Sequence, residues 1–211
     1  MRRDETFRVG VTVTKTAISD AFGTVVRIGR RTTRYRQLLR EGIKQGRRSH
    51  PGDAHVIMML NLELNELAEH VGILLSEFRR NEMECALQAE LNSIEAYPDA
   101  IKAVAMLRER GVALGISSNL AKPYGAAVEQ LFPSMNTHAF SFENGAAKPD
   151  PRIYQALLER LDPRSGRTAR TDAPEVWIVG DLARCDRDGA RARALVTPTV
   201  LNQARRCSPL S

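Results

Sequence analysis

The sequence predicts an α/β protein with a doubly wound parallel sheet and an inserted segment of helices. After residue 97, short apolar strands alternate with amphipathic helices, which is the pattern of right-handed strand–helix–strand units. Between residues 31 and 97, apolar residues recur only at helical spacing, which favours a small bundle inserted between two strand regions. Polar side chains follow most predicted strands, at the edge where an open parallel sheet places its ligands.

Length and composition are those of an ordinary globular protein. The chain has 211 residues, enough for one domain with a full core and a small insertion. No apolar run is long enough to cross a bilayer, and the charged residues 1–5 lead into no apolar segment of a secretory signal. Cys85, Cys185 and Cys207 form no CxxC pair, which favours free thiols in a reducing compartment. We therefore expect a cytoplasmic protein without a membrane partner, as a monomer or a homodimer.

Positive charge is in excess and unevenly distributed. The formal net charge is +6, and thirteen of the 31 Lys and Arg residues lie within the first 48 positions. The excess is compatible with a basic surface that attracts anions and with a merely soluble basic protein. No helix-turn-helix, zinc-binding or aromatic-stacking signature accompanies it, so the sequence argues against nucleic acid as a partner.

The first predicted strand covers residues 9–19 and is rich in Val, Thr and Ile. It is more polar than a central parallel strand usually is. Asp20 follows it directly and precedes a turn that contains Gly23, so its carboxylate is expected to point out of the sheet edge. A carboxylate in that place can act as a covalent nucleophile, forming an ester or acyl phosphate that water later hydrolyses. The hydroxyl of Thr24 could hold a substrate oxygen.

Three helices are predicted in the inserted segment. Gly46 and Gly72 end the first two, and Ser76 begins the third. Their apolar stripes are Tyr35, Leu38, Leu39 and Ile43; Ile57, Leu60, Leu64, Leu67 and Val71; and Phe78, Leu87 and Leu91. The opposite face of the first helix carries Arg36, Arg40, Lys44 and Arg47 or Arg48. That face is either solvated or a basic lid over an anionic substrate.

The second half of the chain supplies the remaining elements of the sheet. Helices are predicted to begin at Pro98, at Lys122 and at Pro151, because proline is favoured in the first helical turn. Strands are predicted at residues 112–117, 139–142, 175–180 and 197–201. Since the strands of such a sheet run parallel, their carboxyl ends share one edge.

Polar groups gather at that edge. Ser118 and Asn119 follow one strand, Lys148 follows the next, and Asp181 follows a third. We expect these groups to converge with Asp20, which would combine a nucleophile, a hydroxyl donor, a cation and a second carboxylate. Asp20 and Asp181 together can hold a hard cation such as Mg²⁺ through oxygen atoms. Lys148 can offset the repulsion between these carboxylates and a substrate anion.

Four motifs in order resemble those of the haloacid dehalogenase superfamily of hydrolases. They are Asp20-Ala21-Phe22-Gly23-Thr24, Gly115-Ile116-Ser117-Ser118-Asn119, Lys148-Pro149-Asp150-Pro151-Arg152-Ile153-Tyr154, and Val179-Gly180-Asp181 with Asp186 and Gly189-Ala190. The resemblance covers nearly the whole chain. It implies a Rossmann-like core from residues 1–30 and 97–211, with an α-helical cap at residues 31–96 inserted after the first motif.

The resemblance also implies roles for individual residues. Asp20 would be the nucleophile, assisted by Thr24, and Ser118 and Lys148 would bind the transferring group. Mg²⁺ would be held by the carboxylates of Asp20 and Asp181, with Asp186 as a further candidate, and by the main-chain carbonyl of Phe22. Asn119 and Tyr154 are candidate substrate contacts.

Position 22 departs from the phosphatases of this superfamily. They usually have a second Asp two positions after the nucleophile, whose acid–base help is typically worth about 10²–10⁴-fold. Phe22 cannot transfer a proton, and His50 or His55 as substitutes have no supporting pattern. An aromatic residue at that position is usual in the haloacid dehalogenases proper, and Tyr154 fits those enzymes as well.

The fourth motif, by contrast, is unlike that of the haloacid dehalogenases and favours a phosphatase. The haloacid dehalogenases tend to have Ser and Asn where this chain has Asp181 and Ala183, and they use no metal. The predicted cap also lacks a clear match to their halide-binding Arg. We therefore expect a hydrolase that acts on a small anionic metabolite through an aspartyl intermediate, with Mg²⁺-dependent phosphatase-type chemistry. A metal-independent 2-haloacid dehalogenase and a degenerate member that binds without turnover remain as alternatives.

Overall fold

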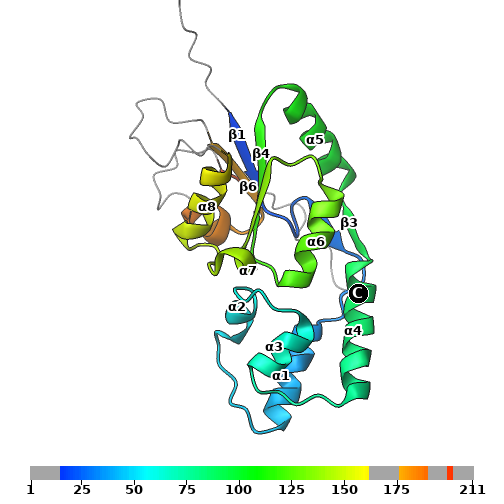
Figure 1. Cartoon of the computed structure of the whole chain (residues 1–211). Helices are drawn as coiled ribbons and strands as arrows, with labels where there is room; N and C mark the ends of the chain where they lie inside the picture. The colour runs from blue at the N-terminus through cyan, green and yellow to red at the C-terminus, as the bar shows by residue number, and fades with distance from the viewer. Residues whose placement is uncertain (1–14, 162–175, 190–198, 202–211) are drawn as a thin grey trace, which may run out of the picture.

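The computed structural model describes residues 15–161, 176–189 and 199–201. Its centre is a five-stranded sheet in the order β5-β4-β1-β6-β7, in which all neighbours run parallel (Figure 1). The strands are β1 (Thr16–Ser19), β4 (Ala113–Ser118), β5 (Thr137–Phe140), β6 (Val176–Gly180) and β7 (Thr199–Leu201). The predicted α/β class with a parallel sheet is therefore confirmed. Of the first predicted strand, residues 9–14 lie outside the described part of the chain.

Helices cover both faces of the sheet. They are α5 (Pro98–Glu109), α6 (Lys122–Leu131) and α8 (Pro151–Leu161), each at its predicted place. Leu114 and Ile116 of β4 pack in one apolar core with residues of α5 and α6, whereas Ile18 of β1 packs in another with residues of α8. The strand predicted to reach residue 142 ends at Phe140, where the short helix α7 (Ser141–Asn144) begins.

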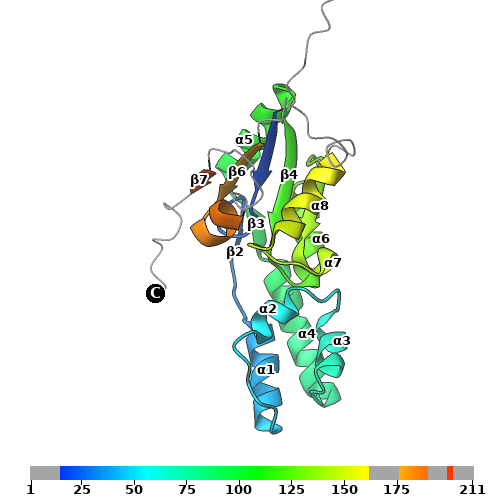
Figure 2. The same ribbon diagram turned by 90° about the vertical axis from the view of Figure 1, so that its left-hand side faces the viewer.

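Four further helices form a separate bundle beyond the carboxyl end of the sheet (Figures 1 and 2). They are α1 (Arg34–Lys44), α2 (Asp53–Ile57), α3 (Leu64–His70) and α4 (Glu77–Leu91), and we call them the bundle. The bundle has its own apolar core, in which Leu38, Leu67 and Met83 are fully or almost fully buried. Helical periodicity predicted apolar stripes here because each helix buries one face against the others. The second of the three predicted helices is in fact two short helices, α2 and α3.

The segment predicted as helices alone contains a strand at its end, which corrects the prediction. β3 (Ile94–Ala96) pairs antiparallel with β2 (Val26–Ile28), and Arg27 pairs with Glu95 across the ladder at 2.8 Å. The two strands lie on the segments that lead into and out of the bundle. Each is three residues long, which is too short for alternation of apolar and polar residues to identify a strand from sequence.

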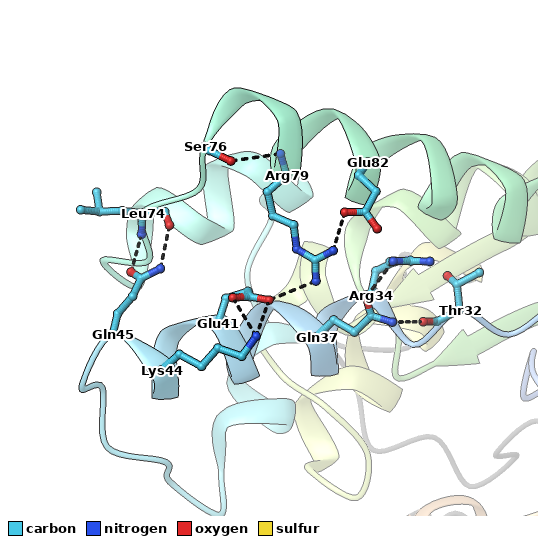
Figure 3. Close-up of polar contacts among 10 residues, drawn as sticks. All are labelled: Thr32, Arg34, Gln37, Glu41, Lys44, Gln45, Leu74, Ser76, Arg79 and Glu82. Atoms are coloured by element: carbon cyan, nitrogen blue, oxygen red, sulfur yellow. Dashed lines mark hydrogen bonds and ion pairs between the residues drawn. The ribbon is translucent and has the colours of Figure 1, made fainter.

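Polar contacts join α1 to α4 along the outer side of the bundle (Figure 3). Arg79 on α4 lies 3.1 Å from Glu41 on α1, and Lys44 contacts the same carboxylate at 3.1 Å. The side-chain amide of Gln45 accepts from the main-chain N–H of Leu74 and donates to its carbonyl. Ser76 accepts a hydrogen bond from the main-chain N–H of Arg79, which confirms the predicted start of α4.

Two residues of the predicted apolar stripes are exposed instead. Phe78 is 80% exposed in the first turn of α4, and Ile43 is 48% exposed in the last turn of α1. Both lie at the end of the bundle away from the sheet, where no described element covers them. Periodicity indicates which residues share a face, but it does not indicate how far the neighbouring helix extends. Within the described residues, no helix combines the length and apolar character needed to span a membrane.

Leu38 and Ile43 lie on the same helix and separate the buried and exposed parts of its stripe. Leu38→Ala should lower the free energy of unfolding by about 2–5 kcal/mol, because it leaves a cavity in the core of the bundle. Ile43→Ala is the matched control and should cost less than about 1 kcal/mol. Urea unfolding followed by circular dichroism measures both. Equal costs would contradict the packing described for α1.

Candidate active site

The sequence-predicted polar residues meet at the carboxyl edge of the sheet. The ammonium of Lys148 lies 2.8 Å from Oδ1 of Asp20 and 2.6 Å from Oδ1 of Asp186. All three side chains are buried. The main-chain N–H of Asp20 donates to the carbonyl of Val179 at 2.8 Å, so the nucleophile candidate is held directly against β6.

Asp181 completes a cluster of carboxylates. One oxygen each from Asp20, Asp181 and Asp186 lies within 4.8 Å of the others, and the main-chain N–H of Leu182 donates to Asp186 at 3.0 Å. Asp186 belongs to a single π-helical turn, η1 (Ala183–Asp188), which follows β6. The turn brings Asp186 back toward the strand end, where Asp181 already lies.

Two glycines make room for this approach. Gly23 has a φ of +83°, and a Cβ there would lie 2.8 Å from Oδ2 of Asp181. A Cβ on Gly180 would overlap the carboxylate of Asp186. A side chain at either position would therefore push a carboxylate out of the cluster, which explains why both turns need the residue without a Cβ.

Burial and mutual attraction together set the protonation of the cluster. Burial alone lowers the pKa of Lys148, but the charges of Asp20 and Asp186 outweigh it and raise that pKa above the ordinary value. Burial raises the pKa of Asp186, and the charge of Asp20 adds to the rise while Lys148 opposes it. Lys148 is thus a cation at neutral pH, paired with the carboxylates of both Asp20 and Asp186.

Ser118 and Asn119 follow β4, as predicted. Ser118 is 2% exposed and lies beside Phe140 in the sheet register. The side-chain amide of Asn119 donates to the carbonyl of Lys148 at 2.9 Å and accepts from its N–H at 2.7 Å. Asn119 therefore fixes the main chain that carries the ammonium, a positioning role that the sequence reasoning missed. The residue type gives no signal for this contact, because the partner lies 29 positions away.

Tyr154 lies behind the site, which corrects its prediction as a substrate contact. Its ring is fully buried on α8, among residues that pack against β1 and β6. Its hydroxyl donates to the carbonyl of Cys185, and burial raises the pKa of the phenol above its ordinary value. Tyr154 thereby supports the η1 turn that carries Asp186 and has no surface left for a substrate.

The remaining candidates lie outside the cluster. Thr24 is 4% exposed and lines a cavity of about 180 Å³ on the α5 side of the sheet, together with Ala100 and Val104. His50 and His55 are exposed on the bundle, so neither takes the place of the missing general acid. A larger open groove, of about 630 Å³, lies between α4 and α6 and is lined by none of the cluster residues.

A cavity of about 270 Å³ lies between the bundle and the segments that follow β1 and β4. Its lining comes from the turn after β1, from α1 and α2, and from the segment after β4: Phe22, Ile28, Tyr35, Arg36, Leu39, Ala54, Ile57, Met58, Asn119, Leu120, Ala121 and Tyr124. Among these described residues only Arg36 is charged. The ring of Phe22 meets that of Tyr124 edge to face, with centroids 5.8 Å apart.

The predicted basic face of α1 therefore has two parts. Lys44 is paired with Glu41, and Arg47 binds both carboxylate oxygens of Asp53 at 2.7 and 2.8 Å. Arg36 instead reaches the cavity beside Phe22. A guanidinium at an apolar wall favours an anion over a neutral molecule in that cavity.

Comparisons with known proteins agree with this architecture. A family model described as haloacid dehalogenase-like hydrolase matches residues 14–192. A curated relative, Phosphatase MT3486 from Mycobacterium tuberculosis (strain CDC 1551 / Oshkosh), is 34% identical over 95 residues. That match spans 43% of this chain and 43% of the relative, so it covers less than half of either protein.

Solved structures share the fold over most of the chain. A HAD phosphatase from Thermococcus onnurineus has 19% identity and a TM-score of 0.53, covering 89% of this chain and 86% of that one. A 2-haloacid dehalogenase from Pseudomonas syringae pv. Tomato DC3000 has 15% identity and a TM-score of 0.57, covering 94% and 90%. A HAD family enzyme from Bacteroides thetaiotaomicron, complexed with magnesium and inorganic phosphate, has 14% identity and a TM-score of 0.55, covering 89% and 93%.

Lys148→Met removes the cation while keeping an apolar side chain of similar length. It should lower the free energy of unfolding by about 3–5 kcal/mol without divalent cations, because buried carboxylates lose their partner. Lys122→Met is the matched control, since Lys122 is paired with Glu63 at 3.3 Å on the surface. An exposed pair should contribute less than about 1 kcal/mol. Chemical denaturation of the two variants measures the difference, and equal losses would refute the charge balance described above.

Proposed function

Because the chain belongs to the haloacid dehalogenase-like hydrolases, we propose that it is a Mg²⁺-dependent phosphatase of small anionic esters. The observation that carries this proposal is the third carboxylate, Asp181, beside Asp20 and Asp186. Three carboxylates whose oxygens lie this close together form the oxygen-rich donor set that a hard divalent cation prefers. The names of the curated relative and of the Thermococcus onnurineus structure also favour phosphatase chemistry.

Asp20 is the proposed nucleophile. Its carboxylate oxygen attacks the phosphorus of the ester, and the bond from phosphorus to the leaving oxygen breaks. The leaving oxygen takes the electron pair and receives a proton from water. A second water then attacks the aspartyl phosphate, which releases phosphate and restores Asp20. Lys148, at 2.8 Å from Asp20, orients the attacking carboxylate and counters the charge of the incoming phosphoryl group.

The donor set fits Mg²⁺. Its oxygens come from Asp20, Asp181 and Asp186, and the main-chain carbonyl of Phe22 belongs to the same turn as Asp20. Hard cations prefer such oxygen ligands, and the glycines at 23 and 180 let the carboxylates approach. When bound, Mg²⁺ would stabilise negative charge on the transferring phosphoryl group.

The bundle is proposed to act as a cap that selects the substrate. Its helices α1 and α2 form one wall of the 270 Å³ cavity, and the turn after β1 forms another. The wall is mostly apolar, and Arg36 adds one positive charge. These features favour a small anion with an apolar body as the substrate.

A metal-independent 2-haloacid dehalogenase is the second candidate. It is favoured by the aromatic side chain of Phe22 and by the apolar cavity with Arg36 beside it. Halide leaves without a proton, so the missing general acid is no obstacle to that reaction. The carboxylate of Asp181 has no role in it, however, which is why we prefer the phosphatase. A member that binds without turnover is the third candidate, and it rests on Phe22 and on the polar character of the first predicted strand.

Two activity assays, with Asp20→Asn as the test of the nucleophile, separate the three candidates. The unmodified protein should release phosphate from p-nitrophenyl phosphate only with Mg²⁺, and Asp20→Asn should reduce the rate by about a thousandfold or more. Asp150→Asn is the control, because Asp150 is paired with Arg152 on the surface. Metal-independent chloride release from 2-chloropropionate would favour the dehalogenase instead. No activity in either assay would favour the member that binds without turnover.

Phe22→Asp tests whether the missing proton donor limits the rate. A carboxyl group at this position should raise kcat for an alkyl ester such as glycerol 2-phosphate, whose leaving oxygen needs a proton, by at least about tenfold, within the range of acid–base catalysis. Phe22→Leu is the control, since it removes the ring contact with Tyr124 and adds no acid. Steady-state kinetics with saturating Mg²⁺ measures the effect. An equal rate for both variants would mean that cavity shape, and not the proton, is limiting.

A further inference from the structure

One buried charged residue lies outside the Asp20 cluster. Glu90, near the end of α4, is 3% exposed. The other buried charged side chains of the described residues are Asp20, Lys148 and Asp186, and all three belong to the cluster. None of the described Lys, Arg or His side chains makes an ion pair with Glu90. A buried carboxylate is costly unless hydrogen bonds compensate for the lost water, so its partners indicate what it does.

Glu90 is bound by neutral donors from two other parts of the chain. The main-chain N–H of Thr32 donates to Oε2 at 2.6 Å, and the hydroxyl of Thr32 donates to the same oxygen. The hydroxyl of Tyr124 donates to Oε1 at 3.1 Å. Thr32 lies on the segment that leads into α1, and Tyr124 lies on α6 of the sheet domain. One carboxylate therefore connects the bundle, its incoming segment and the sheet.

The contact lies where both connections of the bundle run side by side. The main-chain N–H of Gly29 donates to the carbonyl of Ser93 at 3.0 Å, and that of Arg30 donates to the Ser93 hydroxyl at 2.9 Å. The Ser93 hydroxyl in turn donates to the carbonyl of Glu90 at 2.7 Å. Any rotation of the bundle against the sheet must bend these two connections, so Glu90 lies at the hinge.

Tyr124 links Glu90 to the cavity. Its ring lines the cavity and meets the ring of Phe22 edge to face at 5.8 Å. The ring of Tyr35, on α1 of the bundle, lies 6.3 Å from it. The position of Tyr124 thus sets the cavity wall beside Phe22, and Glu90 holds the hydroxyl of Tyr124 in place.

We propose that Glu90 is a positioning residue that fixes the bundle relative to the sheet and aligns the aromatic wall of the cavity. It acts through Thr32 and Tyr124 and touches no substrate. The proposal rests on the proposed phosphatase function where it concerns substrate selection. A substrate whose body fills the cavity should depend on Glu90, whereas one that presents little beyond its phosphoryl group should not.

Glu90→Gln tests this with two substrates. KM for p-nitrophenyl phosphate should rise by about tenfold, which corresponds to one lost hydrogen bond to a charged group, while KM for acetyl phosphate should change less than about twofold. Glu84→Gln is the matched control, because Glu84 is exposed on the same helix. Equal rises for both substrates would overturn the proposal, since general loss of structure affects both alike.

Tyr124→Phe keeps the ring and removes one donor. It should raise KM for p-nitrophenyl phosphate, as Glu90→Gln does. The double variant should have the same KM as Glu90→Gln alone. Additive effects would mean that the two residues act separately, which contradicts the proposal. If Glu90→Gln does not fold, Thr32→Val removes only the hydroxyl donor to Glu90 and takes its place in the same cycle.

Hydrogen–deuterium exchange tests the hinge without relying on activity. Glu90→Gln should speed exchange at residues 29–33 and 91–93 and leave β4 unchanged. If the protein releases no phosphate from any ester, the proposed function fails, yet faster exchange at these residues still supports the hinge. Unchanged exchange at both connections would overturn the role of Glu90, whatever the activity.

Discussion

The arrangement of the site depends on the ion pairs that Lys148 makes at the carboxyl edge of the sheet. A buried ammonium is unfavourable unless it is paired, and the Asp20 and Asp186 carboxylates have the same requirement. The strand order makes the pairing possible, because β1 lies between β4 and β6 and delivers Asp20 next to Asp186. Asn119 then holds the main chain of Lys148 from the end of β4. The segments that follow β1, β4 and β6 thus supply either a charge or the group that holds one.

The chemistry that this cluster could support depends on the residues at positions 22 and 181. The carboxylate at 181 adds a third oxygen donor beside Asp20 and Asp186, which is what the proposed divalent cation would use. Phe22 removes the usual proton donor and closes one side of the cavity with an aromatic ring. The two features are compatible when the leaving group is acidic enough to depart without help. If the proposed phosphatase function holds, an ester of that kind or an acyl phosphate would suit the site better than an alkyl ester.

The sequence predicted the sheet and its cluster because both follow from periodicity and from the shared end of parallel strands. It also located the bundle, whose helices repeat apolar residues at helical spacing. The failures have a common physical origin. Tyr154 was expected at the substrate, but it is buried and its hydroxyl binds the main chain of Cys185. The contacts of Asn119 with the main chain of Lys148 were not predicted either, because only the folded chain brings these partners near. Phe78 was expected in a core because spacing does not reveal where a neighbouring helix ends.

In the proposed phosphatase, chemistry and substrate selection would reside in different parts of the structure. The Asp20 cluster is built from the sheet and its following turns, so its charge balance does not depend on where the bundle lies. The cavity has walls from both bodies, and its shape depends on the angle between them. The buried carboxylate of Glu90 joins the bundle, its connection and the Tyr124 wall, and it shares no contact with Lys148. Changes in the bundle or its hinge can therefore alter which anions fit while the nucleophile and its cation remain in place.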